Sequence, residues 1–445
     1  MPKFSLSKLN NKHFLALASN GLIAVMAFVQ MGFIYRKMEM DEVGTWFFFL
    51  SIIGIAESIR SGFLSTATIK FYAGTEPERA KAVLGSVWYL ALAITGAMVV
   101  ADLGFLACLK FVHDKELALS AKWFGITFAS SLPYTLIFWI LMADERYDKI
   151  LWLRFVNNGS MLVAVIACVM LDKMTLEALL WINFLSNVLT SLAGIVFGFA
   201  RLQTITHRTR ECILELFHFG KFSLGTTFIS NLLGNVDVFV LKFMLGPAAV
   251  AIYNIPIKFM QLVEIPLRSF VGTGMSGMSI AYNNNNPGRV KQILTKYSGM
   301  MAIAFIPMAV VTFLVADQAI YIIGGAKYAG TEAANLFRIF MLFCVLSPID
   351  RFNGATLDVI HKPNVNFYKV ILMLVVNVSA DFLGITLFKN MYGIALGSSV
   401  TLLAGMIFGY FMLRKYVSYT IGDIFITGYT EMKMFISKWI SVIKR

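Results

Sequence analysis

Charged residues are scarce in this sequence. Only 14% of its 445 residues are Asp, Glu, Lys or Arg, whereas 58% are hydrophobic and the mean hydropathy is +0.73. An ordinary soluble domain carries about 25% charged residues. A chain this apolar cannot cover its surface with polar groups, so the composition excludes an ordinary soluble globular protein.

Motifs for catalysis and metal binding are also missing. The sequence contains no HExxH, no CxxC pair and no GxxxxGK[ST] loop, so a zinc site and an ATPase module are not expected. The few histidines and cysteines are isolated from one another: His13, His113, His207, His218, His361, Cys108, Cys168, Cys212 and Cys344. The sequence therefore predicts no catalytic residue, no metal, no disulfide framework and no cofactor, and an ion gradient or the substrate must supply the energy for any work.

What the sequence has instead is a series of long apolar segments. A membrane-spanning helix needs about 20 mainly apolar residues. We predict twelve such helices, at about residues 14–35, 46–69, 83–109, 118–142, 150–171, 177–200, 219–245, 250–281, 297–322, 332–357, 365–388 and 391–413. No connection between them is long enough for a soluble catalytic domain, which requires about 50 residues or more. The predicted fold class is an all-α polytopic membrane protein.

Lysine and arginine gather on alternate connections, beginning with the N-terminal segment. Because cytoplasmic loops are enriched in these residues, both termini are predicted to be cytoplasmic. The net charge of +13 does not indicate nucleic-acid binding, since the basic residues lie between apolar segments and not on one soluble face. The first predicted span is too long for a cleaved signal peptide and is expected to act as its own targeting signal.

The two halves of the chain repeat one pattern. Val43, Trp46, Glu57, Phe63 and Thr66 recur at the same spacing as Val250, Tyr253, Glu264, Phe270 and Thr273. Six spans return the chain to the same side, so the halves should be related by a pseudo-two-fold axis along the membrane normal. We predict an N-terminal lobe over residues 1–205, a C-terminal lobe over residues 206–415, and a cytoplasmic tail over residues 416–445. The alternative is that apolar segments resemble one another by composition alone.

The tail has the pattern of an amphipathic helix. Apolar residues recur at three- and four-residue spacing from Phe425 to Ile443, with lysines alongside. Such a helix is typical of the surface of the anionic inner leaflet. A partly ordered tail without a role is the alternative.

Several ionisable residues lie inside the predicted spans, where they are costly unless they face a protein interior or a watery cavity. The second span contains Glu57 and Arg60, and the eighth contains Lys258, Glu264 and Arg268. We predict that these five residues, with Asn235 of the seventh span, line a substrate-binding cavity between the lobes. Asp237 and Glu264 are candidate ion-coupling residues. The alternative is that Glu57 with Arg60, and Glu264 with Arg268, are ion pairs that only fix helix packing.

Prolines inside the predicted spans indicate bends, because proline removes a backbone hydrogen bond. Pro256 and Pro266 lie in the eighth span, and Pro133, Pro307 and Pro348 lie in others.

A family resemblance follows from the repeat and from short blocks. The VGTW and VAIY segments and the block NVDVFVLKFMLGPAAVAIYNIPIKF at residues 235–259 resemble Wzx-type O-antigen flippases, the polysaccharide exporters of the multidrug/oligosaccharidyl-lipid/polysaccharide (MOP) superfamily. The resemblance implies a MATE-like fold and alternating access through a central cavity. It also implies an undecaprenyl-pyrophosphate-linked oligosaccharide as substrate, membrane lipids as surroundings, and polysaccharide polymerase or chain-length proteins as partners.

The expected function is therefore flipping of an O-antigen or other lipopolysaccharide repeat unit across a bacterial inner membrane, with coupling to H⁺ or Na⁺ left open. One alternative is a cation-coupled multidrug exporter of the same fold. An alternative of another class is a membrane polysaccharide polymerase or glycosyltransferase.

Overall fold

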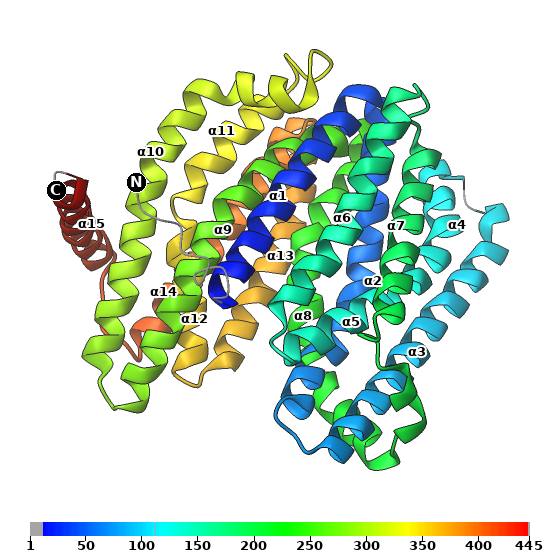
Figure 1. Ribbon diagram of the computed structural model, residues 1–445. Coiled ribbons are helices and arrows are strands. Elements are labelled where there is room, and N and C mark those ends of the chain that lie inside the picture. Colours follow the sequence, from blue (N-terminus) through cyan, green and yellow to red (C-terminus); the bar gives the residue numbers. More distant parts are fainter. Residues whose placement is uncertain (1–11, 112, 444–445) are drawn as a thin grey trace. The chain divides into compact units, whose positions relative to one another are not determined.

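A computed structural model describes residues 12–111 and 113–443. Over these residues the chain is built from α-helices and two short 3-10 helices, without a strand (Figure 1). The helices of the first half are α1 (Lys12–Lys37), α2 (Met40–Tyr72), α3 (Pro77–Ala107), η2 (Leu109–Phe111), α4 (Lys115–Ser130), α5 (Leu132–Ala143), α6 (Tyr147–Met170), α7 (Leu176–Val196) and η3 (Leu202–His207). Those of the second half are α8 (Arg210–Leu245), α9 (Pro247–Asn283), α10 (Pro287–Gly324), α11 (Ala333–Cys344), α12 (Ser347–Val359), α13 (Pro363–Phe388), α14 (Tyr392–Arg414) and α15 (Ile421–Ile443).

The helices confirm the predicted fold class. Among the described residues, nine helices are long and apolar enough to cross a membrane, and two bent helix pairs raise this number to eleven when each pair is one span. Each of these spans falls on one of the predicted segments, and α1 covers the first predicted segment. The chain is a multi-pass membrane protein.

Two predicted spans are broken in the middle. The α4–α5 pair bends by 42° and the α11–α12 pair by 48°. Pro133 and Pro348 lie in the first turns of α5 and α12, where a proline costs no helical hydrogen bond of its own. The predicted effect of these two prolines is confirmed. In contrast, α9 continues through Pro256 and Pro266 as one helix, and α10 continues through Pro307.

The chain folds into two compact units, which divide inside α8. Unit 1 comprises Met1–Asn235 and unit 2 comprises Val236–Arg445. Arg79 of α3 forms an ion pair with Glu215 near the start of α8, and a Cβ atom on Gly220 would lie 2.5 Å from the backbone oxygen of Phe63 in α2. These contacts hold the first turns of α8 on unit 1. The division between the compact units, after Asn235, therefore lies later in the sequence than the end of the predicted N-terminal lobe at residue 205.

The connection before α8 is packed rather than loose. A Cβ atom on Gly85 of α3 would lie 2.2 Å from the carbonyl oxygen of Thr204 in η3. The indole N–H of Trp88 donates a hydrogen bond to the carbonyl of Ala200, at 3.0 Å. The predicted basic linker is therefore fixed against α3.

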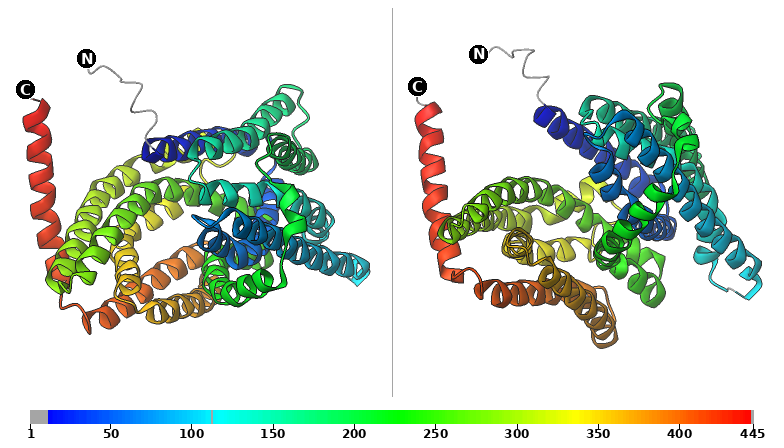
Figure 2. Two further views of the ribbon diagram at one scale, coloured as in Figure 1. Left: turned by 60° about the horizontal axis from the view of Figure 1, so that its bottom comes forward. Right: turned by 90° about the horizontal axis from the view of Figure 1, so that it is seen from below.

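The predicted tail forms α15, which belongs to unit 2. Figure 1 shows α10 along its length and α15 foreshortened, and the right view of Figure 2 shows α15 along its length, so α15 crosses α10 at a steep angle. The tail is thus a docked helix.

Candidate functional site

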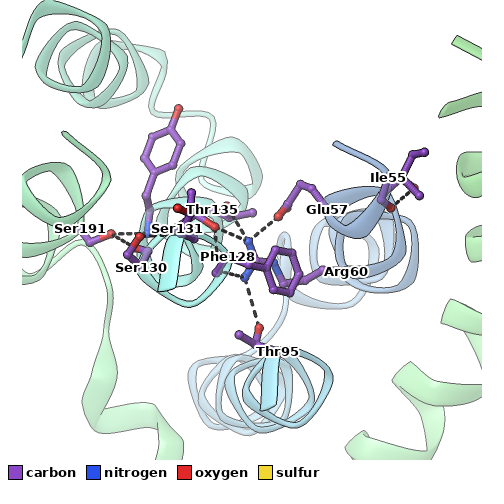
Figure 3. Close-up of polar contacts among 12 residues, drawn as sticks. Ile55, Glu57, Arg60, Thr95, Phe128, Ser130, Ser131, Thr135 and Ser191 are labelled. Carbon is purple, nitrogen blue, oxygen red and sulfur yellow. Dashed lines mark hydrogen bonds and ion pairs between the residues drawn. The ribbon is translucent and has the colours of Figure 1, made fainter. Parts of the chain in front are cut away.

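The predicted charges of unit 1 form a buried ion pair between Glu57 and Arg60 on α2 (Figure 3). The Arg60 side chain is 0% exposed. Its guanidinium also donates hydrogen bonds to the hydroxyls of Thr95 at 3.2 Å and Ser131 at 2.8 Å, and to the carbonyl of Phe128 at 3.2 Å. Arg60 therefore joins α2 to α3 and to the break between α4 and α5.

The break between α4 and α5 exposes backbone groups that need partners, since an α-helix leaves its last carbonyls unpaired. The carbonyl of Phe128 accepts from both Arg60 and the Ser131 hydroxyl. Ser191 of α7 donates to the carbonyl of Ser130 at 3.0 Å and accepts from the backbone N–H of Tyr134 at 3.2 Å. The polar side chains around the bend thus compensate for the broken helix.

This position differs from the one predicted for Arg60. We expected its guanidinium on a cavity surface, available to phosphate. In the structure its side chain is 0% exposed and its described contacts lie within unit 1, so a substrate contact of Arg60 stays a prediction. The alternative interpretation of Glu57 with Arg60, an ion pair that fixes helix packing, agrees with their observed contacts. The two terminal nitrogens of the guanidinium contact five neighbours, while its Nε atom is buried without a hydrogen-bond partner.

The predicted charges of unit 2 are more exposed. Glu264 of α9 accepts from Arg268 at 2.7 Å and from Arg351 of α12 at 3.2 Å. The two arginine side chains are 75% and 57% exposed, and Glu264 is 28% exposed. Two guanidinium groups share one carboxylate, which leaves one positive charge in this cluster at neutral pH.

Lys258 and Asn235 have other described contacts. Lys258 is six residues before Glu264, about 9 Å along α9, and its ammonium donates to the Gln261 side chain at 3.4 Å. The Asn235 amide donates to the carbonyl of Asn231 on its own helix at 2.8 Å. A substrate contact by either residue stays a prediction.

Asp237 lies in a buried polar cluster of unit 2. The hydroxyls of Tyr253 and Ser398 both donate to its Oδ2 atom, the second at 3.0 Å. Its Oδ1 atom is buried and has no hydrogen-bond partner.

A second carboxyl group, that of Asp381 on α13, belongs to the same cluster. Asp381 is 0% exposed and lies against Gly397, the chain neighbour of Ser398, whose hydroxyl donates to Asp237. The amide of Asn377 donates to Asp381 at 3.3 Å, and both Asn377 Oδ1 and Asp381 Oδ1 are buried without a partner. A Cβ atom on Gly397 would lie 2.5 Å from Asp381 Oδ1, so glycine leaves room for this carboxylate.

This acidic cluster has the chemistry of a small-cation site. Two adjacent carboxylates repel each other unless a proton or a cation lies between them. The unpaired oxygens of Asp237, Asn377 and Asp381 are hard ligands. Among the described residues, no group of three or more His, Cys, Asp or Glu side chains is placed to hold a metal ion, so the cluster offers two carboxylates and neutral oxygens only.

Sequence reasoning missed Asp381 and Arg351. Asp381 lies within the predicted span 365–388 with Asn377 one turn earlier, so the rule that ionisable residues in spans are functional candidates would have found it. Arg351 lies within the predicted span 332–357. Its contact with Glu264 joins residues 87 positions apart, which sequence spacing does not reveal.

Comparison with known proteins identifies the family. The profile of the polysaccharide biosynthesis protein family matches residues 9–273. The chain belongs to this family. A second profile, MatE, matches residues 223–383. A comparison with curated protein sequences gives no match.

Solved structures confirm the fold of this family member. An inward-facing multidrug resistance MATE transporter of the MOP superfamily is 16% identical, with a TM-score of 0.73, and the match covers 92% of this chain and 100% of the other. The lipid II flippase MurJ in an inward closed conformation is 14% identical, with a TM-score of 0.75 and coverage of 96% and 93%. A MOP superfamily transporter from Pyrococcus furiosus is 16% identical, with a TM-score of 0.61 and coverage of 92% and 95%.

The solved structures that share this fold are membrane transporters and a flippase. The predicted MATE-like fold is confirmed. This member of the polysaccharide biosynthesis family has a MATE-like fold.

Proposed function

We propose that this protein flips an undecaprenyl-pyrophosphate-linked oligosaccharide, a repeat unit of O-antigen or another surface polysaccharide, from the cytoplasmic to the outer leaflet of a bacterial inner membrane. The observation that carries the proposal is the Glu264–Arg268–Arg351 cluster, with two exposed guanidinium groups on one carboxylate. Guanidinium groups bind phosphate oxygens in a bidentate manner, and a pyrophosphate can take the place of the shared carboxylate. The match to the polysaccharide biosynthesis family supports the sugar part of the substrate.

The substrate path follows from the chemistry of each part. The anionic headgroup and sugar enter a cationic central cavity from the cytoplasmic side and meet Arg268, Arg351 and Lys258. The polyprenyl chain stays in the lipid, because it is apolar. The lobes then rock to release the headgroup outward. Each negative charge that leaves an inside-negative cell gains about 2.3 kcal/mol per 100 mV, so the membrane potential favours export.

The acidic cluster of Asp237 and Asp381 supports coupling to H⁺ or Na⁺. Coupling-ion sites in transporters lie within the helix bundle, where polar oxygens replace water around the ion. The buried, unpaired oxygens of this cluster are suited to that role. Glu264 is the other predicted coupling residue. Because Arg268 and Arg351 already bind it, we assign it to the headgroup cluster, which consists of Glu264, Arg268 and Arg351.

A deletion strain complemented with variants tests the proposal. Arg268→Ala, Arg351→Ala and Lys258→Ala should each lower surface polysaccharide at least about tenfold, the effect of losing about 1.4 kcal/mol of binding in the transport cycle. The lipid-linked oligosaccharide should then accumulate in the inner leaflet, while protein levels stay unchanged. Arg289→Ala is the matched control, since Arg289 is an exposed arginine of the same unit that binds only a neighbouring glutamine side chain, at 2.6 Å, among its described side-chain contacts.

The result also separates the alternatives. Full export by all three variants would reject the headgroup cluster. Hypersensitivity of the deletion strain to drugs, with normal polysaccharide, would favour the cation-coupled multidrug exporter. Loss of polymer with normal appearance of single repeat units on the outer surface would favour a polymerase.

A further inference from the structure

The last helix, α15, presents an apolar face that unit 2 leaves uncovered. Ile421, Phe425, Tyr429 and Met432 lie within about 80° of one another around the helix. Ile421 is 40% exposed and Tyr429 is 64% exposed, and Ile426, 70% exposed, lies about 60° beyond Tyr429 around the helix. An uncovered apolar face on an ordered helix indicates a binding partner that covers it.

The helix is held on α10 by a close backbone contact. A Cβ atom on Gly428 would lie 2.4 Å from the carbonyl carbon of Gly299, and one on Gly299 would lie 2.0 Å from the carbonyl oxygen of Ile424. Ile424 is fully buried in this contact. The helix start is fixed by a capping box, in which Thr420 N–H donates to Asp423 at 3.0 Å and Asp423 N–H donates to Thr420 at 3.1 Å.

Two ion pairs set the rotation of α15 about its own axis. Lys291 binds Asp423 at 2.8 Å and Lys296 binds Glu431 at 2.6 Å. Both lysines precede Gly299 on α10, so the polar face of α15 points toward the beginning of α10. The apolar face, on the opposite side of α15, therefore points along α10 toward its later, apolar turns.

The depth of α15 follows from the exposed side chains of α10. Its exposed large apolar residues begin at Ile306 and continue to Ile322, a segment that corresponds to the hydrocarbon core. Gly299 precedes this exposed apolar segment and is the third residue of the predicted span 297–322, so α15 crosses α10 at one end of the span. The end of a span lies at the membrane interface, where amphipathic helices lie parallel to the membrane. The steep crossing of α10 and α15 agrees with that orientation (Figures 1 and 2).

The charge of α15 selects the kind of lipid. After Glu431 the sequence contains four basic residues and no acidic residue: Lys433, Lys438, Lys444 and Arg445. Lys433 is exposed on α15. We infer that α15 is an interfacial helix whose uncovered apolar face contacts an anionic phospholipid surface. The contact between Gly299 and Gly428 docks the helix on α10 so that Tyr429 faces the acyl chains. The predicted amphipathic tail thereby gains a fixed depth and a defined lipid-facing side.

Fluorescence quenching in vesicles tests this inference. The four native cysteines are replaced, and a fluorophore is attached at Tyr429→Cys or, about 100° farther around the helix, at the exposed Thr430→Cys. The full chain is reconstituted in phosphatidylcholine with or without phosphatidylglycerol. Nitroxide-labelled lipid should quench the Tyr429 probe several-fold more than the Thr430 probe, and aqueous acrylamide should show the reverse. Phosphatidylglycerol should increase the difference, and salt should reduce that increase.

Matched glycine variants test the docking contact. Gly428→Ala should remove the difference between the two probes, because its Cβ meets the α10 backbone. Gly422→Ala should keep the difference, since its Cβ would meet only the Thr420 hydroxyl, at 3.6 Å. Monodispersity in detergent shows whether each variant is folded.

Three outcomes would overturn the inference. Equal acrylamide quenching of both probes would mean that the apolar face is in water. Protection of Tyr429 from both quenchers would mean that a protein, such as a second copy, covers the face. Equal protection with and without phosphatidylglycerol would reject the anionic lipid.

Discussion

The guanidinium of Arg60 donates a hydrogen bond to the carbonyl of Phe128, 3.2 Å away, in the last turn of α4 before the bend. A charged side chain of α2 thus forms a hydrogen bond with a backbone carbonyl next to the break in another span. The same guanidinium neutralises Glu57, whose Oε1 atom is buried without a hydrogen-bond partner. Arg60 is therefore placed to stabilise the bent shape of the α4–α5 span.

We predict that Arg60→Ala destabilises the folded protein by about 3–5 kcal/mol, because removal of one partner leaves a buried charge uncompensated. Thermal unfolding in detergent measures the loss. Arg268→Ala is the control, since Arg268 is 75% exposed and exposed ion pairs contribute about 0–1 kcal/mol. Equal melting temperatures for Arg60→Ala and the unmodified protein would show that Arg60 is not a packing residue, and would restore the substrate contact first predicted for it.

Most of the fold was predictable from the sequence, because a membrane helix is defined by a long apolar segment. The breaks in the fourth and tenth spans were signalled by Pro133 and Pro348, but Pro307 lies in an unbroken helix. Proline alone does not determine a break, since neighbouring side chains must also satisfy the freed backbone groups.

The candidate site was less predictable, because it depends on contacts between distant spans. Sequence spacing paired Glu57 with Arg60, and the structure contains this pair, yet spacing did not reveal that the helices α3 to α5 bury it. The partner of Glu264 on another helix, Arg351, was likewise out of reach of local patterns. Burial and long-range pairing are tertiary properties, so an ionisable residue in a span indicates a site without defining its neighbours.

The second prediction concerns sodium binding by Asp237 and Asp381. If Asp237 and Asp381 hold Na⁺, the ion should raise the melting temperature of the protein, because a ligand bound only to the folded state stabilises it by about 2.7 kcal/mol at 100 times its Kd. Asp381→Asn should abolish the difference between NaCl and choline chloride. Asp317→Asn should keep it, since Asp317 is an exposed acid of the same unit, 66% exposed, that pairs with Arg338. Equal sodium shifts in all three proteins would reject this cluster as the sodium site.

The docking of α15 should depend on pH through Asp423. The hydrogen bond from Lys291, followed by that from the backbone of Thr420, lowers the pKa of the Asp423 carboxyl below its ordinary value. A lowered pKa means that the ionised form favours the docked helix, so this contribution is present above about pH 4, the ordinary value for Asp. It is lost as the pH falls through the lower pKa of the docked state.

We therefore expect acrylamide quenching of the Tyr429 probe in detergent to be constant from about pH 7 to 5 and to rise below about pH 4. Asp423→Asn should remove the part of this rise that is due to Asp423. An identical acid response in both proteins would show that the Lys291–Asp423 pair does not hold α15.

The final prediction concerns the contact between α13 and α14. A Cβ atom on Gly393 would lie 2.2 Å from the carbonyl carbon of Gly384, and one on Gly384 would lie 2.4 Å from the Gly393 oxygen. Small residues at such crossings allow helix backbones to approach closely in membranes. Gly393→Ala should therefore destabilise unit 2 by about 1–3 kcal/mol, the usual effect of overpacking.

The same substitution at Gly272 of α9 is the control, because nothing lies within 4 Å of the added Cβ. It should be neutral or stabilise by up to about 1 kcal/mol, because alanine favours helix more than glycine does. Melting temperatures in detergent compare the two variants, and since α13 carries Asp381, Gly393→Ala should also weaken the sodium-dependent shift. A Gly393→Ala protein that melts at the same temperature as Gly272→Ala would mean that the two helices are farther apart than the structure places them.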